Sequence, residues 1–195
     1  RKFKGQISYI VNNDITKLNI SKMNVVTDNG ININKGELSI SINAIEREIK
    51  HIGMQLNRIN LKSAHEIIRH IPYTNSLQSI FEKVSPTGQL KDLKLNWKNS
   101  NNKIADLALQ AQLLNVSVKP FRDLPGIKNL TGIVNINKKG GKIKSVSKDM
   151  VIVKTDLFRQ ALTFSQFSGE IEWKNNLFNF KNIVNKNNDI NSIVN

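Results

Sequence analysis

The stretch Pro86–Trp97, PTGQLKDLKLNW, decides how this chain folds, because its glycine-led, alternating phrase returns along most of the sequence. Variants of the phrase begin at Gly5, Gly36, Thr131, Gly141 and Ser168. Glycine can adopt the backbone conformations of a turn that precedes a strand. Alternation at period two places Leu93, Leu95 and Trp97 on one face of that strand. No catalytic residue recurs with the phrase, so the repeat predicts a binding surface rather than a reactive site.

Short connections join the strand-like phrases, and this predicts antiparallel pairing because parallel strands need a crossover element between them. Turn signals such as Asn29-Gly30 support hairpins. Lys142–Ser147 and Met150–Thr155 read as two separate strands. We expect a mainly β fold, a long curved antiparallel sheet.

A helical period replaces the alternation between Ser63 and Val84, where apolar residues recur three and four positions apart. Ser63 followed by Glu66 predicts a capping box at the start of this insert, and Pro86 marks its end. The pattern predicts a β segment over 1–61, a short two-helix insert over 62–85 and a second β segment over 86–195. Because the chain starts without Met and stops within a polar tract, we expect it to be a fragment of a longer protein.

The composition points to a folded and basic chain of 195 residues with 39% hydrophobic residues and a net charge of +14. The lysines are spread along the whole chain instead of gathering in one stretch, whereas phosphate binding needs charge on one face. The absence of cysteine excludes a disulfide framework. No apolar run approaches the roughly 20 residues of a membrane-spanning helix, so we expect any membrane anchor to lie outside this stretch.

Catalytic and metal motifs are weak. His65 and His70 stand five positions apart, whereas the zinc-protease motif needs histidines four apart on one helical face. Lys138–Lys142, KKGGK, lacks the ending of a phosphate-binding loop and precedes a strand. We expect no enzyme, no metal site and no cofactor.

The order and spacing of several motifs carry a family resemblance. They are Pro86, Gly88 and Trp97, then Pro125, Gly126, Leu130 and Gly132, then Phe158, Gly169, Ile171 and Trp173. In this order they resemble the AsmA-like envelope proteins of Gram-negative bacteria, specifically the YhdP branch. The resemblance covers about Leu61–Trp173, and the residues before Leu61 match only as generic strands.

The resemblance implies that the sheet forms a hydrophobic groove in the periplasm, anchored to the inner membrane by a segment outside this chain. Such a groove would conduct phospholipids toward the outer membrane. The implied partners are phospholipid acyl chains, the inner membrane, and the outer membrane or its proteins, and no nucleic acid is expected.

The groove lining predicted from the alternating strands consists of Leu38, Ile40, Ile42, Leu93, Leu95, Trp97, Leu107, Leu109, Val134, Ile136, Ile171 and Trp173. From the pattern alone, this face is equally an ordinary core covered by a second sheet or by the helices. Two other functions stay open: an envelope scaffold that assists outer-membrane assembly by strand addition, and a basic nucleic-acid-binding module, which only the net charge supports.

Overall fold

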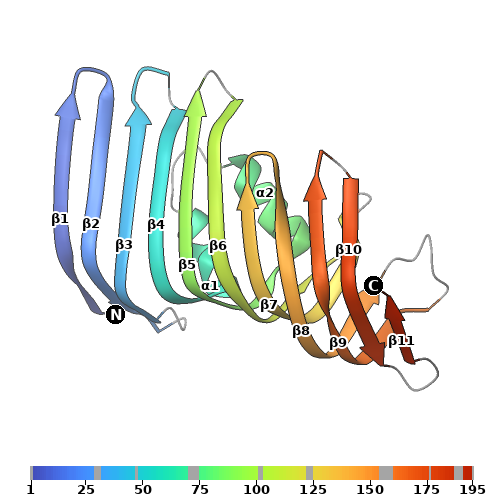
Figure 1. The fold of residues 1–195 in the computed structure, drawn as a ribbon. Coiled ribbons are helices and arrows are strands. Elements are labelled where there is room, and N and C mark those ends of the chain that lie inside the picture. The colour runs from blue at the N-terminus through green and yellow to red at the C-terminus, as the bar shows by residue number, and fades with distance from the viewer. Residues whose placement is uncertain are drawn as a thin grey trace.

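Eleven strands form one antiparallel sheet in which each strand pairs with its neighbours in sequence (Figure 1). The structure is a computed structural model that describes residues 2–28, 32–46, 48–69, 75–100, 103–121, 125–153, 160–175, 177–186 and 191–194. The predicted turn at Asn29-Gly30 and the motif residue Phe158 lie outside the described residues. The strands are β1 (Lys2–Asn12), β2 (Ile15–Val26), β3 (Asn32–Asn43), β4 (Glu48–Asn60), β5 (Thr87–Ser100), β6 (Lys103–Val118), β7 (Gly126–Asn137), β8 (Gly140–Val153), β9 (Leu162–Lys174), β10 (Leu177–Lys186) and β11 (Asn191–Val194). The predicted fold class, a mainly β antiparallel sheet, is confirmed.

The insert consists of helices α1 (Leu61–Arg69) and α2 (Asn75–Val84). Strands β4 and β5 on either side of it pair directly, so the sheet continues past the insert without a break. In Figure 1 the helices lie behind the sheet, and Leu61 and Ala64 of α1 pack against the main apolar cluster. The helices therefore cover part of the apolar face of the sheet.

Helix α1 begins earlier than the capping box predicted. The side-chain oxygen of Asn60 accepts a hydrogen bond from the backbone N–H of Lys62 at 2.9 Å, which makes Asn60 the N-cap. Ser63 lies inside the first turn and is buried. The prediction of Ser63 as the cap was wrong, because α1 begins directly after β4. Asn60 is the last residue of β4 and also caps α1.

Residues in the left-handed backbone region interrupt most strands. Lys22, Asp92, Asn115, Asn129, Asp149 and Asn182 all have φ between 49° and 60° within the interior of β2, β5, β6, β7, β8 and β10. Lys35 of β3 also has a φ of 55°, and the residue after it is the buried Gly36. Register shifts accompany several of them, as between Lys91 and Lys94. A bulge of this kind bends its strand and increases its twist. Asp149 also explains why β8 is one strand where two were predicted, since the chain passes through the bulge without leaving the sheet.

Six of these positions, all except Lys35, share a two-residue pattern. The left-handed residue is exposed, and the residue that follows it is apolar and buried. The buried partners are Met23, Leu93, Val116, Leu130, Met150 and Ile183. Side chains converge on the inner side of a bend and diverge on the outer side, so the apolar face is the inner face of the curved sheet.

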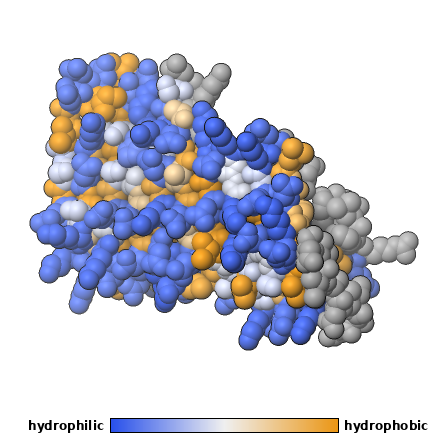
Figure 2. Space-filling view, in the orientation of Figure 1, coloured by the Kyte–Doolittle hydropathy of each residue, from blue (hydrophilic) through white to orange (hydrophobic). Residues whose placement is uncertain are grey.

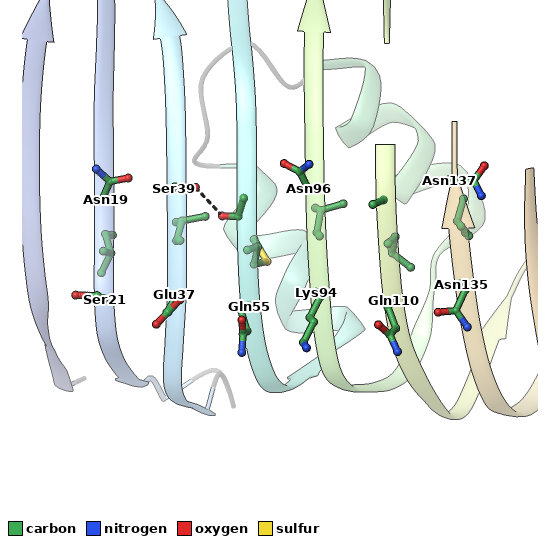
Figure 3. Close-up of a pocket in the computed structure, with 18 residues that line it drawn as sticks. Asn19, Ser21, Glu37, Ser39, Gln55, Lys94, Asn96, Gln110, Asn135 and Asn137 are labelled. Carbon is green, nitrogen blue, oxygen red and sulfur yellow. Dashed lines mark hydrogen bonds between the residues drawn. The ribbon is translucent and has the colours of Figure 1, made fainter. Parts of the chain in front are cut away.

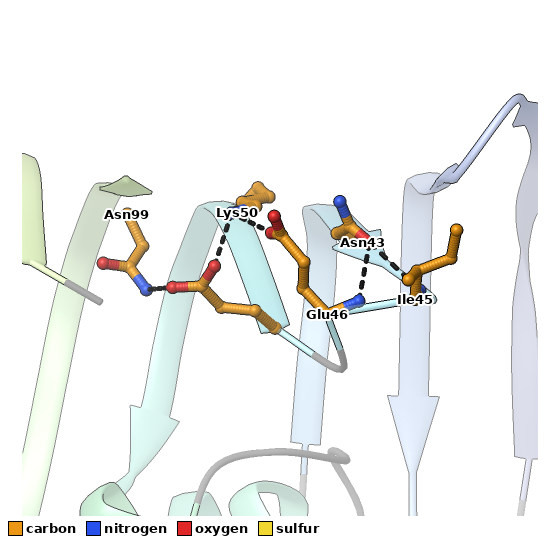
Figure 4. A network of polar contacts seen from close by, with 6 residues as sticks. Asn43, Ile45, Glu46, Lys50 and Asn99 are labelled. Carbon is orange, nitrogen blue, oxygen red and sulfur yellow. Dashed lines mark hydrogen bonds and ion pairs between the residues drawn. The ribbon is translucent and has the colours of Figure 1, made fainter. Parts of the chain in front are cut away.

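The hairpin tip between β3 and β4 has a local polar network (Figure 4). The side-chain oxygen of Asn43 accepts hydrogen bonds from the backbone N–H groups of Ile45 at 3.0 Å and Glu46 at 2.9 Å. Lys50 pairs with Glu46 and Glu48, and the hydrogen bond to Glu46 is the main reason that the pKa of Lys50 is raised. The network fixes the turn at the rim of the sheet.

The outer face of the sheet is polar. Figure 2 has the orientation of Figure 1, and hydrophilic residues predominate on the face turned toward the viewer, with hydrophobic residues visible between them as a band. This is the face opposite the helices. The two faces therefore differ in chemistry, as the period-two alternation predicts.

Candidate functional site

One apolar row crosses ten of the strands in register. Each member is the direct cross-strand partner of the next, from β1 to β10, and the row contains no charged residue. We call it the central row: Ile7, Ile20, Leu38, Met54, Leu95, Leu109, Ile136, Gly141, Trp173 and Phe178. With neighbouring strands about 4.8 Å apart, such a row extends over about 40 Å.

Two shorter rows flank the central row on the same face. Toward the hairpin tips, Ile40, Ile52, Trp97 and Leu107 are successive partners on β3 to β6. Toward the bend, Ala111, Val134, Ile143, Ile171 and Phe180 are successive partners on β6 to β10. The inner face is thus at least two rows deep along most of its length.

On β6, burial of the inner-face residues falls from the bend toward the rim. Ala111, Leu113 and Val116 of β6 are buried near the bulge, whereas Leu107 and Leu109, nearer the tip, are half-buried. A core sandwiched between two layers would be buried along the whole strand. At β6 the inner face of the curved sheet therefore opens toward the rim.

The structure places all the predicted lining residues on this inner face, although at different depths. Ile40, Leu93 and Val134 are buried, so they lie beneath the surface that a ligand would contact. The others are half-buried: Leu38, Ile42, Leu95, Trp97, Leu107, Leu109, Ile136, Ile171 and Trp173. Their contact with a ligand stays a prediction.

Part of the face is closed. Ile40, Ile49 and Ile52 form a separate buried cluster on β3 and β4, with Leu95 and Trp97 packed against it. Leu61 of α1 closes the main cluster beside β4 and β5. The reading of this face as a covered core therefore applies around β3 to β5, next to the helices.

Toward both edges of the sheet the same face is exposed. Ile7 and Tyr9 of β1 are 60% and 65% exposed, and Phe178 and Phe180 of β10 are 51% and 57% exposed. Each is the cross-strand partner of an inner-face residue, as Phe178 is of Trp173. The predicted lining omitted them. The same alternation over Gln6–Val11 and Leu177–Val184 would have identified them.

Charged side chains gather on the outer face instead. Lys142 on β8 pairs with Glu170 and Glu172 on β9, and Lys181 on β10 donates to Glu172 at 2.7 Å. The hydrogen bond from Lys181 and then that from Lys142 lower the pKa of Glu172, and Lys142 lowers the pKa of Glu170. The pKa of Lys142 is raised in turn, first by Glu170 and then by Glu172.

Other kinds of site lack support in the part of the chain that the structure describes. No group of three or more His, Cys, Asp or Glu side chains there could hold a metal ion. Neither α1 nor α2 has the length and apolarity needed to cross a membrane. The continuous central row makes the inner apolar face the candidate functional site.

An open, curved antiparallel sheet with one uncharged apolar face defines a class of groove-forming β proteins. Within this class, the chain belongs to the YhdP family, since the family model described as YhdP protein matches residues 5–192. This match confirms the resemblance seen over Leu61–Trp173 and extends it to the strands before the helices. Neither the comparison with curated proteins nor the comparison with solved structures found a match.

Proposed function

We propose that this chain is a periplasmic segment of an inner-membrane-anchored protein that conducts phospholipids between the inner and outer membranes, holding their acyl chains against the inner face. The central row is the observation that carries the proposal. It is continuous from β1 to β10, uncharged and nowhere fully buried. Membership of the YhdP family supports a place in the bacterial envelope.

The energetics of acyl-chain transfer favour such a surface. Exposing hydrocarbon to water costs about 0.8 kcal/mol for each methylene, so ten methylenes would cost about 8 kcal/mol. Apolar side chains at every strand spacing remove most of this penalty. Because dispersion and the hydrophobic effect are non-directional, successive positions hold the chain similarly and none traps it.

Photo-crosslinking in cells tests the proposal. A photoreactive residue at Leu95 or Leu109, which are cross-strand partners in the central row, should capture phospholipid. The same residue at Gln110, the next position on β6, points to the outer face and should not. Labels at Leu95 and Leu109 that capture no phospholipid, while the protein is folded and in the envelope, would refute the proposal.

One observation favours the scaffold function as a second candidate. β1 is exposed along its whole length, and within the described residues it pairs only with β2, so one side of its backbone can accept a further strand. A proline within β1 at a position on that free side should then abolish assembly activity, whereas a charge at Leu109 should not. Lipid conduction predicts sensitivity to the charge at Leu109.

A further inference from the structure

A shallow trough crosses the outer face behind the central row. It has a volume of about 640 Å³ and runs across β2 to β7, where each strand contributes three consecutive residues (Figure 3). The middle residue of each triplet belongs to the central row, and its side chain packs against the apolar clusters on the other face. The trough floor is therefore strand backbone, and the flanking polar side chains form its walls.

The first wall contains the small residues that hollow the trough. Ser39, Gly53 and Ala108 share this wall with asparagines that already have hydrogen-bond partners. Asn96 contacts a ring nitrogen of His51 at 2.9 Å and donates to Asp106 at 3.3 Å. Across the strands this wall runs through Asn19, Ser39, Gly53, Asn96, Ala108 and Asn137.

The second wall offers free hydrogen-bonding groups. Gln55, Gln110 and Asn135 make no side-chain hydrogen bond within the part of the chain that the structure describes, and all three are exposed. With Glu37 and Lys94 they form one register row, in the order Glu37, Gln55, Lys94, Gln110 and Asn135. Five adjacent strands thus present donors and acceptors at intervals of about 4.8 Å.

The trough is neutral although the chain carries a net charge of +14. Among its lining residues Glu37 and Lys94 are charged, with opposite signs. Half of the others carry an amide or a hydroxyl group, and the other half are apolar residues or glycine. A polyanion would need an excess of positive charge, whereas the one lysine of the lining is balanced by one glutamate. Single-stranded nucleic acid would need aromatic side chains on which its bases can stack, and the lining residues include none. A polypeptide strand pairs through free backbone groups, whereas the floor backbone is already engaged in the sheet.

We propose that this trough binds a neutral, hydroxyl-rich oligosaccharide chain lying perpendicular to the strands. Sugar hydroxyls donate and accept, which matches the paired donors and acceptors of the free amides of Gln55, Gln110 and Asn135. The small residues of the first wall leave room for the rings. The site lies on the face opposite the proposed lipid path, so both ligands can be bound together.

Titration of the whole chain with chitohexaose, a neutral oligosaccharide, tests the proposal by isotope-labelled NMR. We expect saturable shifts confined to the trough strands β2 to β7 and an affinity that does not change with salt, because no charges are neutralised. Ala108→Trp fills the trough at an exposed position and should weaken binding about ten-fold or more. Val146→Trp, at a position on the outer face that does not line the trough and is 69% exposed, should leave the affinity unchanged.

Three outcomes would overturn the inference: no saturable shifts with chitohexaose, equal binding by Ala108→Trp and the parent chain, or stronger, salt-dependent binding of polyglutamate at the same residues. Replacing Gln55 and Gln110 together by alanine supplies a second check that leaves the trough open. It should also weaken chitohexaose binding several-fold. None of these variants alters the inner face, so failure here leaves the lipid proposal intact.

Discussion

The indole ring of Trp173 on β9 lies against the backbone of Gly141 on β8, its direct cross-strand partner. A Cβ atom built at Gly141 would stand 2.3 Å from a ring carbon of Trp173. The absence of a side chain at Gly141 therefore leaves the space that the Trp173 ring occupies. The two residues are adjacent members of the central row. The sequence pattern predicts a turn at Gly141, whereas in the structure the absence of a side chain at Gly141 makes room for the Trp173 ring.

Gly141→Ala should displace the Trp173 ring and lower the free energy of unfolding by about 1–3 kcal/mol, the usual range for overpacking. Urea denaturation measures the loss, and the tryptophan emission should shift as the ring moves. Gly53→Ala is the control. Its Cβ would meet the Ser39 hydroxyl at 2.5 Å and the His51 ring at 3.1 Å. Both are side-chain atoms that can rotate away, so we expect a loss within about 0.5 kcal/mol. Equal losses in the two variants would contradict this account.

At a left-handed bulge we expect the residue with the higher strand propensity to be the less stable one. Lys22 has φ of 50° and an exposed side chain in β2. Valine is the better strand former, but a β-branched residue is strained at positive φ, whereas asparagine tolerates it. Lys22→Val should therefore be less stable than Lys22→Asn by about 1 kcal/mol. Both variants remove the same charge, so urea midpoints compare them directly. A more stable valine variant would show that the bulge does not constrain this residue.

Charge on the inner face should block lipid association. Leu109→Lys places an ammonium group within the central row, and we expect phospholipid to be lost from gently purified protein, as measured by mass spectrometry. Gln110→Lys adds the same charge at the next residue, on the outer face, and should retain it. Leu109→Gln, a milder change, should reduce the bound lipid while circular dichroism shows an intact sheet. Lipid retained in a folded Leu109→Lys variant would contradict the proposal.

The ion pairs of the outer face predict a loss of stability in acid. The pKa of Glu172 is lowered in the folded state, mainly by Lys181 and then Lys142. A carboxylate with a lowered pKa stabilises the fold above its ordinary value, 4.5, and this contribution disappears as pH falls through the folded-state pKa. The Tm of the parent chain should thus drop more than that of Glu172→Gln between pH 6 and pH 3.

Glu37→Gln is the matched control for the acid prediction, because Glu37 has no ion pair among the described residues. The Tm of the Glu37→Gln variant should fall between pH 6 and pH 3 by as much as the Tm of the parent chain. An identical fall in the Glu172→Gln variant would show that the Lys142, Glu172 and Lys181 contacts do not contribute.

Local signals predicted most of the fold correctly. The strand phrases, their antiparallel order and a helical stretch ending at Val84 are all present. The failures occurred where one residue serves two elements or leaves the strand conformation. Asn60 ends β4 and caps α1, and Asp149 bulges within β8 where a break was predicted. Pairs of an Asp, Asn or Lys followed by an apolar residue can be found in the sequence. Only the positive φ angles in the structure show that these pairs are bulges.

The sequence by itself determined which side chains share a face, because alternation along a strand is a local property and pairing of neighbouring strands carries it across the sheet. Only the tertiary structure decided which part of the apolar face is reachable. Ile40 and Leu109 follow the same alternation, yet Ile40 is buried and Leu109 is half-buried. A residue is buried when segments distant in the sequence, such as α1 or the far side of the bend, pack against its side chain. The outer trough has the same origin, since small residues hollow it only where six strands align them.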